Sequence, residues 1–225
     1  MKGTRIKING ESNYEGYLAV PDSGRGTGVI VIQEWWGLVG HIMNVADRFA
    51  EEGFVALAPD LFLGKTAEEP EEAGKLMMAL NIAETEKILA RAVKFLLAQP
   101  ATEGEKVGVV GYCMGGQLSL FAAATNPQVG ACADFYGIHP NVHPPFANLQ
   151  APVLGFFAEH DDYANAAAVA ALDAELTRAG KAHEFHTFPG VHHAFCNDDR
   201  PVYDGVAAGR AWSRMLEFFR QNLKA

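Results

Sequence analysis

A glycine-rich segment near the middle of the chain constrains the fold more than any other stretch. An apolar, strand-like run over 106–110 is followed by Gly111, and residues 117–124 have the composition of a helix. In the G-x-S-x-G turn, strand and helix nearly touch, so the flanking residues are small and the middle residue is strained. Here the middle residue is Cys113. The segment predicts a strand, a sharp turn and a helix, with the cysteine sulfur at a helix start that favours negative charge.

Two other interpretations fit this turn. Glycine-rich turns between a strand and a helix also hold phosphates, and Asp134 lies about where a ribose-binding acid belongs. The glycines are spaced GxxGxxxGG rather than GxGxxG, which disfavours this interpretation. Alternatively, Cys113 is a buried structural residue, because free cysteine is among the most buried residue types. Partners elsewhere in the chain have to decide between these interpretations.

The composition of the chain argues against several classes of protein. A length of 225 residues suits one domain, and 49% hydrophobic with 20% charged residues is ordinary for a soluble globular protein. The net charge of −9 disfavours nucleic acid and anionic membranes as partners. No run reaches the roughly 18 apolar residues of a membrane span. We expect a single domain over 1–225 that acts as a monomer and binds neither nucleic acid nor membrane.

The cysteines indicate a reducing compartment. They stand at positions 113, 132 and 196, an odd and sparse set that argues for reduced thiols and against a disulfide framework. The first eight residues alternate between polar and apolar types and lack the apolar centre of a signal peptide. We expect a cytoplasmic protein, in which a cysteine nucleophile stays usable.

Apolar runs that alternate with helical patterns predict an α/β fold. We expect strands at 4–9, 14–20, 29–32, 54–58, 106–110, 129–137, 153–158 and 183–188, and helices at 42–50, 71–80, 82–98, 117–124, 165–179 and 205–223. The turn signal Asn9–Ser12 makes the first two strands an antiparallel hairpin. The remaining alternation predicts a mostly parallel, doubly wound sheet with helices on both faces.

Four reactive side chains follow predicted strands directly: Glu34, Cys113, Asp161 and His193. Ligands of such sheets bind at the carboxyl ends of the strands, so we expect these four side chains at one edge. A thiol attacks a carbonyl well when a base takes its proton and a third group orients that base. The order nucleophile, acid, histidine is the order found in α/β-hydrolases. Cys113, Asp161 and His193 therefore form a candidate catalytic triad.

Neighbouring residues offer rival assignments. His192 adjoins His193, while Glu159 and Asp162 are alternative acids that are more typical of solvated positions or helix caps. A metal site could use His192, His193, Cys196, Asp198 and Asp199, but their spacing matches no common zinc pattern. We expect neither a metal nor an organic cofactor.

Over nearly its full length the chain resembles the dienelactone hydrolases, a family of cysteine-dependent α/β-hydrolases. The resemblance rests on the segments Gln33–Gly37, Ala58–Phe62, Gly111–Gly116, the turn at Asp161 and His193–Phe195. It implies the α/β-hydrolase fold and the triad Cys113, His193 and Asp161. It also implies that Glu34 contacts the nucleophile, and we expect its carboxylate to accept a hydrogen bond from the resting thiol.

The resemblance also implies roles in binding. It places the oxyanion hole at the backbone N–H groups of Trp35 and Met114. Trp36 is a candidate substrate-binding residue, although core packing explains both tryptophans equally well.

Charge recognition departs from the pattern of the dienelactone-degrading members. These hold the substrate carboxylate with arginines, one of them four residues after the histidine, where this chain has Asn197. Asn197 is therefore a second candidate substrate-binding residue, with Arg200 and Lys75 as alternative cations. We expect carboxylated dienelactones to be weak substrates.

Together these observations predict a hydrolase that cleaves a small ester or lactone through a thioacyl-enzyme. A non-hydrolytic binding protein on the same scaffold is an alternative. A thiol redox enzyme is a third interpretation, which is disfavoured because no resolving cysteine lies near position 113 in the chain.

Overall fold

The computed structural model describes residues 3–8 and 14–223, which form one eight-stranded sheet of order β1-β2-β4-β3-β5-β6-β7-β8. The strands are β1 (Thr4–Lys7), β2 (Glu15–Ala19), β3 (Gly26–Ile32), β4 (Val55–Pro59), β5 (Thr102–Tyr112), β6 (Val129–Phe135), β7 (Val153–His160) and β8 (His183–His192). The pairs β1·β2 and β2·β4 are antiparallel, and all other neighbours are parallel. The predicted mostly parallel sheet with an N-terminal antiparallel pair is confirmed. The turn predicted at Asn9–Ser12 lies outside the described residues.

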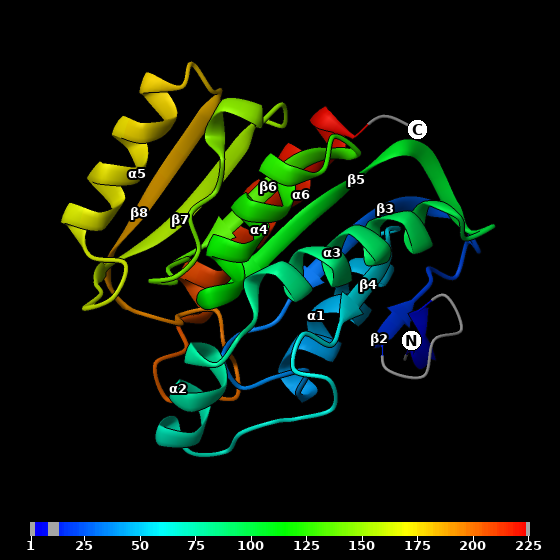
Figure 1. Ribbon diagram of the computed structural model, residues 1–225, viewed down its shortest axis with the longest axis horizontal. Coiled ribbons are helices and arrows are strands. Elements are labelled where there is room, and N and C mark those ends of the chain that lie inside the picture. The colour runs from blue at the N-terminus through cyan, green and yellow to red at the C-terminus, as the bar shows by residue number, and fades with distance from the viewer. Residues whose placement is uncertain (1–2, 9–13, 224–225) are drawn as a thin grey trace.

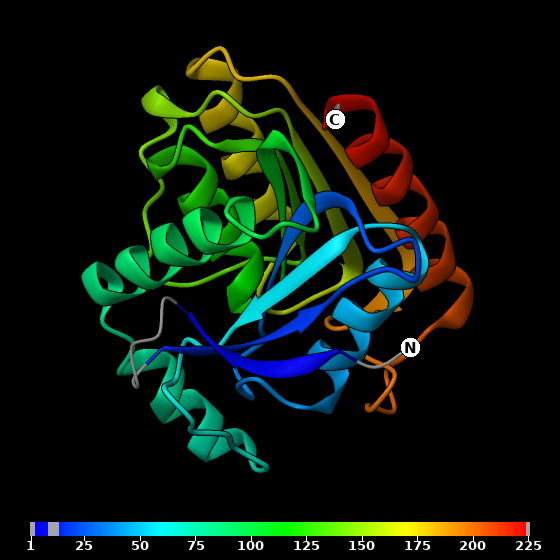
Figure 2. The ribbon, with the colours of Figure 1, turned by 90° about the vertical axis from the view of Figure 1, so that its right-hand side faces the viewer.

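Helices cover both faces of the sheet (Figures 1 and 2). They are α1 (Gly40–Glu51), α2 (Pro70–Met78), α3 (Ile82–Leu97), α4 (Met114–Thr125), α5 (Ala166–Arg178) and α6 (Gly205–Asn222), with a short 3₁₀ turn at Phe146–Asn148. Helices α1 and α6 enclose one apolar core against the sheet, and α3 and α4 enclose the other. Strands between these layers are buried on both faces, which is why they read as continuous apolar runs.

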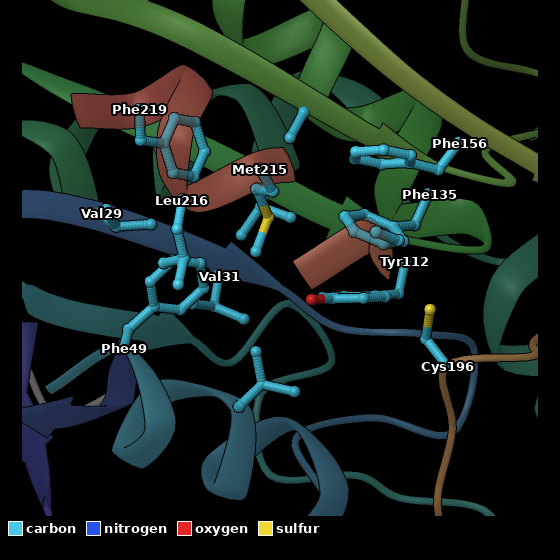
Figure 3. Packing of buried hydrophobic residues seen from close by; sticks show 14 of the residues in the cluster. Val29, Val31, Phe49, Tyr112, Phe135, Phe156, Cys196, Met215, Leu216 and Phe219 are labelled. Carbon is cyan, nitrogen blue, oxygen red and sulfur yellow. The ribbon is translucent and has the colours of Figure 1, made fainter. Parts of the chain in front are cut away.

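The first core contains a row of aromatic rings from three neighbouring strands (Figure 3). The ring centroids of Tyr112 and Phe135 lie 4.7 Å apart, and those of Phe135 and Phe156 lie 4.6 Å apart. Phe219 of α6 packs beside Phe49 of α1 in the same core, with centroids 6.1 Å apart. Because aromatic pairs at such spacings add to the burial energy, the ends of β5, β6 and β7 are held firmly together.

The predicted turn between β5 and α4 is present. Cys113 has φ 55° and ψ −125°, a left-handed conformation that costs a non-glycine residue free energy. A Cβ at Gly111 would lie 1.8 Å from the carbonyl oxygen of Gly115, and one at Gly115 would lie 2.4 Å from that of Gln33. Only glycine permits this approach, so the backbone holds the cysteine at the tip of the turn.

The predicted boundaries were wrong at two strands that matter for the site. β5 begins four residues earlier than expected, because 102–103 pair with the start of β3. β8 continues through Pro189 and Gly190 to His192, since a shift in register after Ala158 lets His192 pair with His160. None of the helices within the described ranges has the length and apolar content needed to cross a membrane.

Candidate active site

A cavity of about 450 Å³ opens at the carboxyl edge of the sheet. Glu34, Cys113 and His193 line its base, and the position of each follows from the strand that ends one or two residues before it. The walls are apolar and come from Trp35, Trp36, Met77, Ile138, Tyr163 and Val202. Reactive groups at the base of an apolar cavity are the usual arrangement of a small-molecule site.

Asp161 and His193 form a tight pair. The Nδ1 of His193 lies 2.7 Å from the Oδ2 of Asp161, whose side chain is fully buried. The other carboxylate oxygen accepts hydrogen bonds from the backbone N–H groups of Tyr163 and Ala164, at 2.8 and 2.9 Å. These three bonds fix the carboxylate, and the carboxylate in turn fixes the ring of His193 with Nδ1 as the protonated nitrogen.

The thiol of Cys113 lies within side-chain hydrogen-bonding reach of His193. Burial of His193 disfavours its charged form, but the bonds to Asp161 and Cys113 outweigh burial and raise its pKa to about 10. The predicted triad residues are therefore brought together in the order acid, base, thiol. Such an arrangement favours the imidazolium that forms when His193 takes the thiol proton.

Glu34 is buried but does not bond the thiol. Its Oε2 accepts a hydrogen bond of 2.5 Å from Asn197 Nδ2, and Oε1 has no partner in the part of the chain that the structure describes. Burial raises the pKa of Glu34 against the opposing charges of His41 and His193. The expected resting bond from Cys113 to Glu34 is not among the hydrogen bonds of the described residues, since the thiol lies by His193 instead.

Asn197 lies behind the cavity. Its side chain is buried against Glu34, and it is not among the described residues that line the cavity. The geometry therefore argues against the expected contact of Asn197 with substrate. The reason is the turn after His193, which directs position 197 toward the end of β3 rather than into the open space.

Of the two alternative cations, only Arg200 reaches the cavity. Its guanidinium carbon lies 3.7 Å from the ring centroid of Trp36, and its Nε is buried without a partner among the described residues. Lys75 is exposed and pairs with Glu71 on α2, with 2.6 Å between Nζ and Oε1. Trp36 packs against Ala73 of α2, as core packing predicts, and it also lines the cavity, so its role in substrate binding stays a prediction.

The two residues predicted to form the oxyanion hole, Trp35 and Met114, lie just after the ends of β3 and β5. Met114 is the first residue of α4, where a helix leaves its N–H groups without intrahelical acceptors. Trp35 follows the end of β3 and lines the cavity beside Cys113. The two residues thus follow neighbouring strands, and their role in an oxyanion hole stays a prediction.

The rival side chains do not line the cavity. His192 and Asp162 are exposed, and Glu159 accepts a hydrogen bond from the Gly190 N–H at 2.7 Å. Asp134 is completely buried beneath α4, so it is not available to a ribose. All three cysteines are free thiols. Among residues 3–8 and 14–223, no group of three histidines, cysteines or acids could hold a metal ion.

Sequence reasoning missed several residues of the site. Met77 and Val202 line the cavity from α2 and from the loop before α6. Tyr136 is fully buried with φ 43°, and its ring lies 5.1 Å from that of His193. Its place directly after β6 is the one signal that could have identified it. No local sequence pattern indicated Met77 and Val202, because the segments that contain them carry no catalytic motif.

Comparison with known proteins finds a family model and curated relatives that match most of the chain. The family model described as "Dienelactone hydrolase family" matches residues 14–223. "Protein usf" of Aquifex pyrophilus is 38% identical, over 92% of this chain and 93% of its own length. A protein of Aquifex aeolicus named "Putative carboxymethylenebutenolidase" is 36% identical, over 93% of this chain and 94% of its own.

A solved structure is similar over almost all of the chain. It is described as a "Putative Dienelactone Hydrolase from Klebsiella pneumoniae" and superposes with a TM-score of 0.88 at 28% identity. The match covers 97% of this chain and 98% of the other. The eight-stranded sheet with its two helical layers is thus the α/β-hydrolase fold.

Proposed function

The chain belongs to the dienelactone hydrolase family, and we propose that it hydrolyses a small ester or lactone through a thioacyl-enzyme formed on Cys113. The family match supports hydrolysis of a lactone or an ester. The cysteine mechanism is proposed from the geometry of the site. The observation that carries it is the chain of contacts from Asp161 through His193 to the strained Cys113 at the base of a cavity.

The first half of the reaction transfers the acyl group to sulfur. His193 takes the proton of the Cys113 thiol, and the sulfur attacks the carbonyl carbon of the substrate. The N–H groups of Trp35 and Met114 stabilise the oxyanion, and one such donor is worth about 3 kcal/mol. The tetrahedral intermediate then collapses, the carbon–oxygen bond breaks, and His193 returns its proton to the departing alkoxide.

The second half releases the acid. His193 takes a proton from water, the resulting hydroxide attacks the thioester, and the carbon–sulfur bond breaks. The thiolate leaves and His193 returns the proton to Cys113. Asp161 keeps Nδ1 protonated throughout, so that Nε2 is the nitrogen that exchanges protons with substrate and water. All of these groups come from one chain, which is why we propose that the enzyme acts as a monomer.

The cavity suggests the kind of substrate. Apolar walls from Trp35, Met77, Ile138 and Val202 suit a ring or a short acyl chain. Arg200 is the cation on this wall, and its guanidinium edge is the group that would meet a carboxylate of the substrate. We propose that a neutral ester binds through the apolar walls alone, and that Arg200 adds binding energy for an anionic lactone.

The test is a panel of 4-nitrophenyl esters, simple lactones and a carboxylated dienelactone, assayed with the wild type and with Cys113→Ala. Loss of a triad member typically lowers kcat about 10⁴- to 10⁶-fold. The matched control is Cys132→Ala, since Cys132 is buried in the core next to Ser119. An unaltered rate in Cys113→Ala would overturn the mechanism. Binding without turnover by the wild type would make the chain a binding protein, and consumption of peroxide would favour the redox interpretation.

A further inference from the structure

Helix α2 (Pro70–Met78) borders the cavity, but little of it is buried against the rest of the protein. Figures 1 and 2 show it projecting from the body of the molecule, apart from the two helical layers. Ala73 is the one buried residue of the helix, and it packs with Trp36 and Ala67 in a small cluster separate from the two cores. Elements with so little buried apolar surface belong to the part of a protein that opens most readily.

The last turn of α2 borders two hollows. Met77 lines the cavity of about 450 Å³. Leu76, together with Ala79 and Leu80 after the helix, lines a second hollow of about 190 Å³, whose other walls come from the loop after β4 and from α3. Close-packed interiors leave no such space, so α2 has room to shift that the helices of the two cores lack.

One side chain ties this helix to another wall of the cavity. His139, on the loop between β6 and β7, is 3% exposed, and its Nε2 lies 3.2 Å from the carbonyl oxygen of Met77. A carbonyl oxygen only accepts, so Nε2 carries the proton of this bond. The last carbonyl groups of a helix lack intrahelical partners, and a histidine is a suitable donor to them. Among the described residues, no other hydrogen bond joins α2 to a different element.

The other nitrogen of His139 fixes the state of the ring. The backbone N–H of Asn141 donates to Nδ1 at 3.2 Å. An N–H group only donates, so Nδ1 is unprotonated and the ring is neutral, with its proton on Nε2. Burial favours the same form, since it lowers the pKa of His139 below the usual 6.5. The flanking residues Ile138 and Pro140 line the cavity, so His139 joins the wall on its own loop to the wall that Met77 supplies.

We propose that His139 is a positioning residue that holds α2 over the cavity and thereby determines which substrates fit. This inference rests on the proposed function, in which the cavity binds the ester or lactone. With the bond in place, Met77 stays in the wall of the cavity. Without it, the helix is free to move toward the second hollow, so the cavity widens and accepts longer acyl chains. The triad lies on other elements and keeps its geometry.

Two variants separate the two bonds of His139. An asparagine keeps an acceptor close to the place of Nδ1 for the N–H of Asn141 but is too short to reach Met77. A glutamine keeps a donor at about the reach of Nε2. His139→Asn therefore releases the helix, and His139→Gln retains it. The matched control is His143→Asn, because His143 lies on the same loop, is exposed and does not line the cavity.

Hydrogen exchange over residues 70–79, measured by mass spectrometry, follows the helix directly and needs no substrate. We expect His139→Asn to speed exchange there about 3- to 10-fold, the effect of losing one hydrogen bond. His139→Gln and His143→Asn should stay close to the wild type, and exchange over α5 should not change in any variant. The proposal is overturned if 70–79 exchanges at the wild-type rate in His139→Asn, if His139→Gln accelerates it as much, or if α5 accelerates by the same factor.

Kinetics with 4-nitrophenyl acetate and 4-nitrophenyl octanoate measure the consequence for substrate choice. In His139→Asn, kcat/KM for the octanoate relative to the acetate should rise about 3- to 10-fold, mainly through KM. The kcat for the acetate should stay within about twofold of the wild type, because the triad is untouched. A wild-type ratio of the two esters, or an equal loss of kcat on both, would overturn the role in selectivity.

The double variant His139→Asn/Met77→Ala shows whether the effect passes through the helix. Once Met77→Ala has removed the side chain that the bond positions, His139→Asn should change the ratio of the two esters little further. A full additional change would contradict an action through Met77. An absence of ester turnover in the wild type would count against the proposed function, whereas hydrogen exchange would still decide whether His139 holds α2.

Discussion

The turn that presents Cys113 and the mouth of the cavity above it are built in opposite ways. At the turn, a Cβ on Gly116 would lie 2.1 Å from Asp134 Oδ1, and one on Gly115 would lie 2.4 Å from the carbonyl oxygen of Gln33. At the mouth, Tyr163 and Val202 of the cavity lining are 56% and 40% exposed. At the turn, the backbone lies in close contact with its surroundings, whereas the mouth consists of side chains on a peripheral helix and on loops.

This difference separates chemistry from selectivity. A nucleophile has to be placed to within about 0.5 Å, and close-packed backbone supplies that precision. The apolar mouth contributes area that many side chains could supply, so its residues are free to differ between relatives. We therefore expect substitutions at the turn and triad to affect every substrate, and substitutions at the mouth to affect some substrates only.

The largest effect is expected in the triad. Asp161→Asn and His193→Ala should lower kcat about 10⁴-fold or more for every ester and lactone in the panel, since both act on the proton of the thiol. Their neighbours Asp162 and His192 are exposed, and Asp162→Asn and His192→Gln should stay within about threefold of the wild type. If Asp162→Asn lowered kcat more than Asp161→Asn, the acid of the proposed triad would be Asp162 instead of Asp161.

A smaller effect concerns the stability of the turn. Burial of Asp134 beneath α4 raises its pKa from the usual 3.8 to about 7. The native state then holds a proton that the unfolded chain has released, so stability is fully present below pH 4 and is lost as pH rises through 7. Asp134→Asn mimics the neutral form at every pH. It should stabilise the protein at pH 8 by up to about 4 kcal/mol and have little effect near pH 4.

Urea unfolding at both pH values checks this prediction, with the exposed Asp162→Asn as a control that should show no pH-dependent difference. Equal effects of Asp134→Asn at pH 4 and pH 8 would mean that the carboxyl titrates normally. The turn would then tolerate a charge beneath it, which would weaken the contrast with the open mouth.

The smallest effect is expected at the cavity wall. Arg200→Gln should lower kcat/KM for a carboxylated lactone about 10- to 100-fold, because a charge-assisted contact is worth about 1.5 to 3 kcal/mol. Turnover of a neutral ester should change by less than threefold. Steady-state kinetics with matched neutral and anionic substrates provide the measurement. Equal losses on both would show that Arg200 supports Trp36 structurally and does not select the substrate.

The sequence was informative where chemistry and local geometry coincide. Glycines on both sides of Cys113 predicted the turn because no other residue fits between strand and helix. The rule that ligands bind where parallel strands end predicted that Glu34, Asp161 and His193 would meet the cysteine. The sequence was uninformative about Met77 and Val202, because no local pattern connects them to the cavity.

By itself, the sequence determined the parallel sheet, the order of the proposed triad residues along the chain and the turn that carries Cys113, because these depend on local spacing and residue type. Only the tertiary structure decided that Asn197 bonds Glu34 rather than facing the cavity, that Arg200 reaches the cavity wall, and that Asp198 meets His41. His41 and Asp198 are 157 positions apart. Contacts of this kind depend on how loops pack against distant elements, which residue spacing does not encode.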